Sequence, residues 1–271
     1  MTRANCCHTY ILFNCFFTLA PSKVKDLSQE LVAVATFSSN FYYLFTQNYF
    51  SSTAEETIFL HTWSLAVEEQ FYIFFPLLLL FIRTKYQRLV VISFLTIASL
   101  FSAIYFSFNN PSLNFYFTPS RIWELMAGSL VAIYYPILAG INLKTRNRLS
   151  VIGLATIGVS VCVFTKETQH PGWPTIIPIL AVCIVIGCSN GTSVSRILDI
   201  KPIRFIGLIS YSLYLWHQPV MAFLSIKFYN LPHTETLILA TMVTGILSYF
   251  TFKFVETPFR HFSFNTTRLF F

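Results

Sequence analysis

The residues of this chain that could do chemistry are a few ionisable side chains inside long apolar runs. Two adjacent glutamates, Glu68 and Glu69, stand near the start of the run HTWSLAVEEQFYIFFPLLLLFI, residues 61–82. Ionisable groups at membrane depth are costly and are usually functional. A carboxylate beside a substrate hydroxyl can act as a general base. Both glutamates are therefore candidate catalytic residues.

A structural role for these two glutamates stays open. If Thr62 or Ser64 caps a helix, both carboxylates fall in its early turns, where the helix dipole favours negative charge. Adjacent helical residues point about 100° apart, so Glu68 and Glu69 face different neighbours. Ser64, Glu68 and Tyr72 share one face. One glutamate can serve structure and the other chemistry, and the pattern does not say which.

A second charged pair lies in FTPSRIWELMAGSLVA, residues 117–132. Thr118 followed by Pro119 predicts a helix start, because proline fits the first helical position. Arg121 and Glu124 are then i, i+3 neighbours that can pair. The pair either holds helices together or contacts a substrate, and both interpretations remain open.

A third set lies in IGLISYSLYLWHQPVMAF, residues 206–223. Ser210, Tyr214 and His217 share a helix face at i, i+4 and i+7. His217 stands two residues before Pro219, which is expected to kink the helix. A histidine at this depth is either a hydrogen-bonded core residue or a functional group.

The elements that must position these residues are membrane spans. The chain has 271 residues, of which 55% are hydrophobic and only 11% charged, far from the composition of a soluble domain. We expect an all-α, multi-pass transmembrane helical bundle with about eight spans, and residues 31–47 as one interfacial or re-entrant helix. The expected spans are 6–20, 64–82, 88–108, 118–138, 149–165, 172–188, 205–225 and 236–255.

The basic residues predict the orientation of these spans. Thirteen Lys and Arg fall in one set of alternating loops and termini, and four fall in the other set. The basic side is read as cytoplasmic, so the net charge of +7 does not indicate nucleic-acid binding. The loops predicted to face outward are 48–63, 109–117, 166–171 and 226–235, and those predicted to face the cytoplasm are 83–88, 139–148 and 189–204. The charged groups near residues 68 and 121 then lie near one face and can partly neutralise each other.

Several motifs are absent from the sequence. It has no phosphate-binding glycine loop, no GxSxG, no HExxH and no zinc-ligand spacing, so no metal site is predicted and ATP-driven transport loses support. The six cysteines lie in or beside apolar stretches, where small buried hydrophobes are expected.

Four segments in order resemble a known family. The run His61–Tyr72 is similar to the signature of the acyltransferase 3 family of bacterial inner-membrane O-acyltransferases. So are PSRIWELMAG at 119–128, YSLYLWHQPV at 211–220 and ETPFR at 256–260. Residues 21–45 resemble the segment that precedes the double-glutamate motif, so the resemblance covers essentially the whole chain.

This resemblance implies an enzyme of the bacterial inner (plasma) membrane. It would transfer an acyl group, usually acetyl, from cytoplasmic acetyl-CoA to a hydroxyl of a surface glycan such as O-antigen, peptidoglycan or exopolysaccharide. Acetyl-CoA is thus the expected donor, the glycan the acceptor and the bilayer the surroundings. The expected catalytic residues are Glu68 and Glu69. The expected substrate-binding residues are His61, Ser64, Arg121, Glu124, Tyr214 and His217.

The resemblance also implies two further helices upstream, the first with a histidine considered catalytic. We therefore expect residues 1–271 to form a single membrane domain that is N-terminally truncated and carries no appended soluble domain. Two alternatives stay open beside the enzyme: a transporter or permease, and a non-catalytic fragment. Dependence on acetyl-CoA distinguishes the enzyme from the transporter.

Overall fold

The structure is a computed structural model that describes residues 21–46, 57–165, 167–228 and 232–261. These residues form helices and no strand, which confirms the all-α class. The chain divides into two compact units. The larger unit comprises the described residues within Phe37–Gln47 and Trp63–Arg204, and the smaller unit comprises those within Met1–Thr36, Asn48–Thr62 and Phe205–Phe271.

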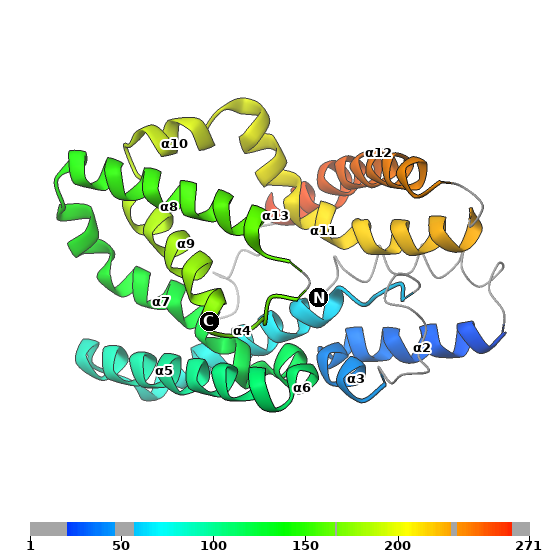
Figure 1. Cartoon of the computed structure of the whole chain (residues 1–271), viewed down its shortest axis with the longest axis horizontal. Helices are drawn as coiled ribbons and strands as arrows, with labels where there is room; N and C mark the ends of the chain where they lie inside the picture. The colour runs from blue at the N-terminus through cyan, green and yellow to red at the C-terminus, as the bar shows by residue number, and fades with distance from the viewer. Residues whose placement is uncertain (1–20, 47–56, 166, 229–231, 262–271) are drawn as a thin grey trace, which may run out of the picture. The chain divides into compact units, whose positions relative to one another are not determined.

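The larger unit is built from antiparallel helices joined by short connections (Figure 1). Thr84 closes the turn between the first two long helices with a capping box, its hydroxyl accepting from the Gln87 backbone N–H. Asn142 caps another helix by accepting from the Lys144 backbone N–H. The helices are α3 (Ser39–Thr46), α4 (Thr62–Phe81), α5 (Lys85–Asn109), α6 (Pro111–Tyr116), α7 (Thr118–Gly140), α8 (Leu143–Val163), the 3-10 turn η1 (Trp173–Thr175), α9 (Ile176–Cys188) and α10 (Ser193–Leu198).

Helices α4, α5 and α7 enclose one apolar cluster centred on Phe71, Ile92 and Met126. The Ser99 hydroxyl of α5 donates to the Pro119 carbonyl (2.5 Å) and accepts from the Trp123 backbone N–H (3.0 Å) at the start of α7. Packing and interhelical hydrogen bonds hold membrane helices together, because lipid is as apolar as the helices themselves.

Helices α8 and α9 meet through a glycine. A Cβ atom at Gly153 would lie 3.0 Å from both the Ala181 carbonyl oxygen and a Val185 methyl carbon. Small residues let membrane helices approach this closely.

The two ends of the larger unit are fixed by different loops. At one end Arg146 donates to the carbonyl of Ala139 (3.3 Å), to that of Cys188 (3.3 Å) and to that of Asn190 (2.5 Å). At the other end the α8–α9 loop reaches α7, where His170 contacts Arg121. The loops 139–148 and 189–204 therefore share one end of this unit, as the alternation of spans predicts.

The smaller unit contains α2 (Pro21–Ala35), most of α11 (Lys201–Lys227), α12 (His233–Thr251), the π-helical turn η2 (Phe252–Glu256) and α13 (Thr257–His261). Helices α11 and α12 pack through Trp216, Val220, Leu224 and Ala240. The Trp216 indole also donates to the Thr251 hydroxyl (2.8 Å). The buried Glu256 accepts from the Ser212 hydroxyl (3.0 Å) and pairs with Arg260 (2.5 Å).

The prediction of about eight spans is too high for the described residues. Five helices are long and apolar enough to cross a membrane: α4, α5, α7, α8 and the stretch Thr234–Arg260. The apolar helix Trp173–Cys188 is shorter, and the middle of α11 carries many polar side chains, such as Ser212 and Gln218. The predicted span 6–20 lies outside the described residues.

The single helix expected over residues 31–47 is also wrong. The chain breaks between α2 and α3 at Phe37, whose φ of 54° lies in the left-handed region that few residues other than glycine adopt. The Phe37 carbonyl accepts a hydrogen bond from the Gln70 side chain (2.7 Å). A tertiary contact thus supports the break.

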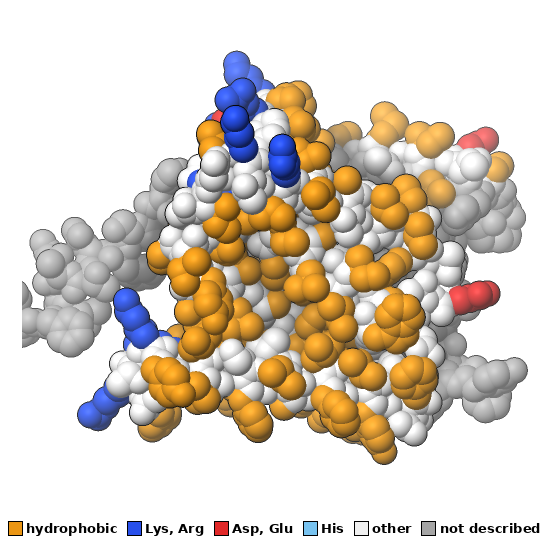
Figure 2. Space-filling model, turned by 60° about the vertical axis from the view of Figure 1, so that its left-hand side comes forward, with side chains coloured by type: hydrophobic (Ala, Val, Ile, Leu, Met, Phe, Trp, Pro, Cys, Tyr) orange, Lys and Arg blue, Asp and Glu red, His pale blue; other side chains and the backbone are white. Residues whose placement is uncertain are grey.

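Hydrophobic side chains cover much of the face that Figure 2 shows, and Lys and Arg gather towards its edges. Large apolar side chains are exposed on the described helices, among them Phe94, Phe101, Ile152 and Val159. An apolar exterior of this kind fits helices surrounded by lipid.

Candidate functional site

The start of α7 is held by a short polar framework. Asn110 caps α6 by accepting from the Leu113 backbone N–H (3.1 Å), and the extended residue Phe117 then leads into α7. The Asn114 side chain donates to the carbonyls of Ala103 (3.0 Å) and Pro171 (2.6 Å). These bonds tie α5, α6 and the α8–α9 loop around the first turn of α7.

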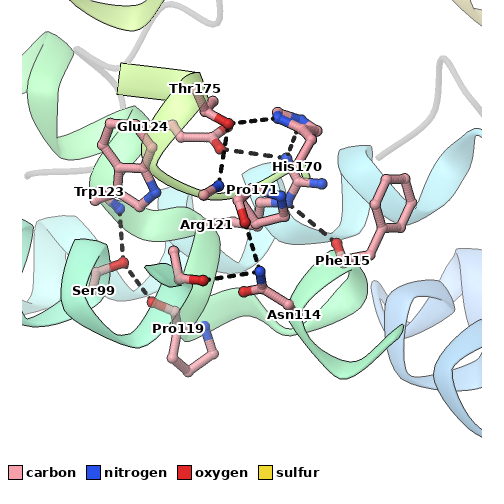
Figure 3. A network of polar contacts seen from close by, with 12 residues as sticks. Ser99, Asn114, Phe115, Pro119, Arg121, Trp123, Glu124, His170, Pro171 and Thr175 are labelled. Atoms are coloured by element: carbon pink, nitrogen blue, oxygen red, sulfur yellow. Dashed lines mark hydrogen bonds and ion pairs between the residues drawn. The ribbon is translucent and has the colours of Figure 1, made fainter. Parts of the chain in front are cut away.

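Arg121 lies at the centre of this framework and is only 5% exposed (Figure 3). Its Nε donates to the Phe115 carbonyl (3.2 Å), and its Nη1 donates to Glu124 Oε1 (3.3 Å) and to His170 Nε2 (2.7 Å). The guanidinium carbon also lies 4.9 Å from the Trp63 ring centroid and 5.0 Å from that of Phe115. The predicted pairing of Arg121 with Glu124 is confirmed.

His170 is held in one tautomer by its two partners. Arginine can only donate, so Nε2 of His170 must accept, and Nδ1 carries the proton and donates to Thr175 Oγ1 (2.9 Å). The residue as a whole is exposed, but its two ring nitrogens face Arg121 and Thr175. Partial loss of water around the ring and the nearby Arg121 charge lower the pKa of His170 to about 4. The ring is therefore neutral at pH 7.

One terminal nitrogen of Arg121 takes part in none of these hydrogen bonds. Arg121 Nη2 is buried and has no hydrogen-bond partner among the described residues. Three further buried polar atoms near the start of α7 share this condition: Asn114 Oδ1, Ser120 Oγ and Trp123 Nε1. A buried donor without a partner costs about 1–3 kcal/mol, and an acceptor oxygen brought to Arg121 Nη2 would remove that cost.

A ring of side-chain amides and a hydroxyl fixes α4 against α7. Gln70 donates to Asn40 Oδ1 (3.0 Å) and accepts from the Thr118 hydroxyl (2.5 Å), while Asn40 donates to Thr118 Oγ1 (3.1 Å). Gln70 directly follows the two glutamates in the chain. The early turns of α4 and α7 therefore meet at one level, as the predicted topology requires.

Glu68 and Glu69 lie in the early turns of α4, and both are half-buried, as is Ser64 in the first turn. In the described structure no hydrogen bond or ion pair links either glutamate to Arg121 or Glu124. The expectation that the arginine neutralises these carboxylates is therefore wrong. Arg121 Nη1 bonds instead to Glu124 on its own helix and to His170.

The remaining predicted residues form a separate cluster in the smaller unit. The rings of His61, Tyr214 and His217 lie with centroids 5.1 to 5.4 Å apart. The Tyr214 hydroxyl donates to the His61 carbonyl, which joins α11 to the chain before α4. The structure thus brings these three residues together, while the Ser210 hydroxyl bonds to Gly207 of its own helix.

His217 is exposed rather than a core residue. Its Nδ1 donates to the Tyr214 carbonyl (2.6 Å), so in the neutral ring the lone pair is on Nε2. That nitrogen can accept a hydrogen bond from a substrate hydroxyl.

Two partners of Arg121 were not predicted from the sequence, namely His170 and the Trp63 ring. A signal for His170 was present, because its loop and the start of the 118–138 span were both predicted at the outward end. In the described ranges, no three His, Cys, Asp or Glu side chains lie where they could hold a metal ion.

Comparison with known proteins gives the family. A family model described as an acyltransferase domain matches residues 9–253. The O-acetyltransferase OatA of Staphylococcus aureus is 30% identical over 264 residues, covering 90% of this chain and 43% of the relative. The peptidoglycan O-acetyltransferase OatA of Listeria monocytogenes is 28% identical over 267 residues, covering 92% of this chain and 43% of the relative.

This chain thus spans less than half the length of these curated relatives. No solved structure matches it. The family model covers most of the chain, and the signatures at 61–72, 119–128 and 211–220 all lie inside the match. The chain therefore belongs to the acyltransferase 3 family of membrane proteins.

Proposed function

We propose that this chain transfers an acetyl group from acetyl-CoA to a hydroxyl of a cell-surface glycan, in the bacterial plasma membrane. The observation that supports the proposal best is Arg121, a buried cation with three hydrogen bonds, two aromatic contacts and one terminal nitrogen, Nη2, that has no partner among the described residues. The name of the Listeria monocytogenes relative makes peptidoglycan the first acceptor to try.

The reaction needs a donor for a developing oxyanion. The acceptor hydroxyl attacks the thioester carbonyl carbon, and the carbonyl oxygen becomes an oxyanion in the tetrahedral intermediate. Arg121 Nη2 is the group we assign to that oxygen, since a preorganised donor in a water-poor site stabilises developing charge strongly. The C–S bond then breaks, and the sulfur leaves as the CoA thiol once it takes up a proton.

A base must accept the proton of the acceptor hydroxyl. Glu68 and Glu69 are the candidates, because both are half-buried in the helix that carries Trp63 against Arg121. Glu124 is less suited to this role, since its Oε1 is already paired with Arg121. His61, Ser64, Tyr214 and His217 are proposed to bind the substrates.

The test is an acetyl-transfer assay in proteoliposomes, with the chain expressed together with any coding sequence that adjoins it in its gene. Labelled acetyl-CoA and a soluble peptidoglycan fragment are supplied, and acetyl ester on the glycan is measured. Arg121→Ala is expected to lower kcat by about a hundredfold or more, as the loss of an oxyanion donor does. Glu68→Gln and Glu69→Gln are tested separately. The variant that lacks the general base is expected to lose kcat by about the same factor as Arg121→Ala.

The matched control is Arg83→Ala, which removes an exposed arginine from the loop after α4 and is expected to leave kcat unchanged. Intact transfer in all three site variants would show that the site is assigned to the wrong residues. Wild-type protein that transfers no acetyl group to any glycan would overturn the function itself.

A further inference from the structure

His170 makes the shortest of the three hydrogen bonds to Arg121. Its Nε2 lies 2.7 Å from Nη1, compared with 3.2 Å for the Phe115 carbonyl and 3.3 Å for Glu124. Figure 3 shows the ring in contact with Arg121 on one side and with Thr175 on the other. Thr175 Oγ1 also accepts from the Gly172 backbone N–H (3.2 Å), so the ring is anchored to the backbone of its own loop.

These anchors set the plane of the guanidinium. Phe115 lies on α6, and Glu124 lies on α7 one turn after Arg121. His170 lies in the α8–α9 loop. A planar guanidinium bonded at Nε and twice at Nη1 has its remaining nitrogen in a fixed direction. Nη2 is the nitrogen without a partner among the described residues.

We propose that His170 is a positioning residue of the acyl-transfer site, whose neutral ring orients Arg121 so that Nη2 meets the carbonyl oxygen of the transferred acyl group. This inference rests on the proposed function and assigns a role to a loop residue outside the sequence signatures. His170 acts through Arg121 and forms no bond to the substrate.

The charged groups around the ring are few among the described residues. Arg121 of α7 contacts Nε2 directly, and Glu124 of α7 shares the same Nη1. Glu167 lies three residues earlier on the same loop and is exposed. A proton on Nε2 would remove the acceptor and place two cations side by side, which would turn the guanidinium away.

The test compares three variants in the acetyl-transfer assay. His170→Phe keeps a ring and removes the acceptor, so kcat is expected to fall at least tenfold with KM changed less than about threefold. His170→Gln offers a side-chain oxygen to Nη1, so it is expected to restore most of the wild-type kcat. The control is Gln169→Phe, the same new side chain on the exposed neighbour, with no change expected.

The second readout is the ratio of the His170→Gln rate to the wild-type rate as a function of pH. The ratio should rise as the pH falls from 7 towards 4, because the glutamine cannot take up the proton that disables the histidine. Equal kcat for His170→Phe and wild type, or a flat ratio, would overturn the inference and leave the proposed function standing. Absence of transfer by the wild-type protein would overturn both.

Discussion

At the scale of residues, the site depends on how one buried cation is neutralised and held. Among the described residues, Arg121 has one carboxylate partner, Glu124, and its other contacts are a carbonyl, an imidazole and two aromatic rings. Cation–π contacts contribute about 0.5–1 kcal/mol each at exposed sites and about 2 kcal/mol or more when they are shielded from water. This mixture keeps the guanidinium charged without consuming both of its terminal nitrogens.

The lowered pKa of His170 predicts that the free energy of unfolding depends on pH. Its pKa in the folded protein is lowered to about 4 from an ordinary value near 6.5. Between these values the unfolded chain binds a proton that the folded chain does not, so the free energy of unfolding falls as the pH drops through this window. Thermal unfolding in detergent should therefore show a smaller loss of stability from pH 7 to pH 4 in His170→Gln than in wild type.

Other groups also titrate between pH 7 and pH 4, so the difference between the two proteins is the quantity that matters. Gln169→Ala should behave as wild type throughout, because the exposed side chain of Gln169 carries no titratable group. An equal or larger acid-induced loss in His170→Gln would contradict the neutral, arginine-bound ring.

Local spacing was enough to predict some of these contacts. Arg121 and Glu124 are three residues apart on a helix, so their pairing follows from helical geometry alone. The contact of Arg121 with His170 joins positions 49 residues apart, and no local pattern encodes it. The roles of Glu68 and Glu69 also stay a prediction. Their spacing shows that the two side chains point in different directions, but not which of them contacts a substrate.

At the scale of elements, the α8–α9 contact depends on a missing side chain. Gly153→Ala would place a methyl group 3.0 Å from the Ala181 carbonyl oxygen, which is backbone and cannot rotate away. We expect the variant to lose about 1–3 kcal/mol of stability through overpacking, measured by thermal unfolding in detergent.

Helix α8 provides its own control. Gly158 lies on the same helix, and a Cβ there would meet nothing within 4 Å. Gly158→Ala should therefore be neutral, or stabilising by up to about 1 kcal/mol, because alanine favours helix. Equal effects of the two substitutions would mean that α8 and α9 are not in this close contact.

The helices themselves were predictable, and the break between α2 and α3 was not. Long apolar runs predicted α4, α5 and α7 to within three residues at each end, whereas α8 begins at Leu143, before the predicted start at residue 149, because its first turns carry basic residues. The break at Phe37 has no glycine or proline to mark it. Its left-handed conformation accompanies a hydrogen bond from Gln70, which lies 33 residues away.

At the scale of the whole molecule, the orientation in the membrane is a prediction from the basic loops. Loop 109–117 is expected outside and loop 139–148 in the cytoplasm. Single cysteines at Ser112 and Lys144 suit a labelling test, because both side chains are exposed. Asn110 and Asn147 lie in the same two loops but are less suitable for substitution, because their side chains take part in hydrogen bonds. The native cysteines are replaced first.

An impermeant thiol probe should label the cysteine at 112 in intact cells, and the one at 144 only after permeabilisation. The reverse pattern would invert the protein. Labelling of both positions from one side would show that α7 does not cross the bilayer.

We propose that an acyl-transfer site, and not a solute path, accounts for the charged residues of this chain. The most direct measurement uses sealed proteoliposomes with labelled acetyl-CoA on the side of the basic loops and a peptidoglycan fragment on the other. We predict acetyl ester on the fragment with wild-type protein, together with release of free CoA, and a large loss of both in Arg121→Ala. Movement of a solute down an ion gradient with no acetyl-CoA consumed would contradict the account and favour a transporter.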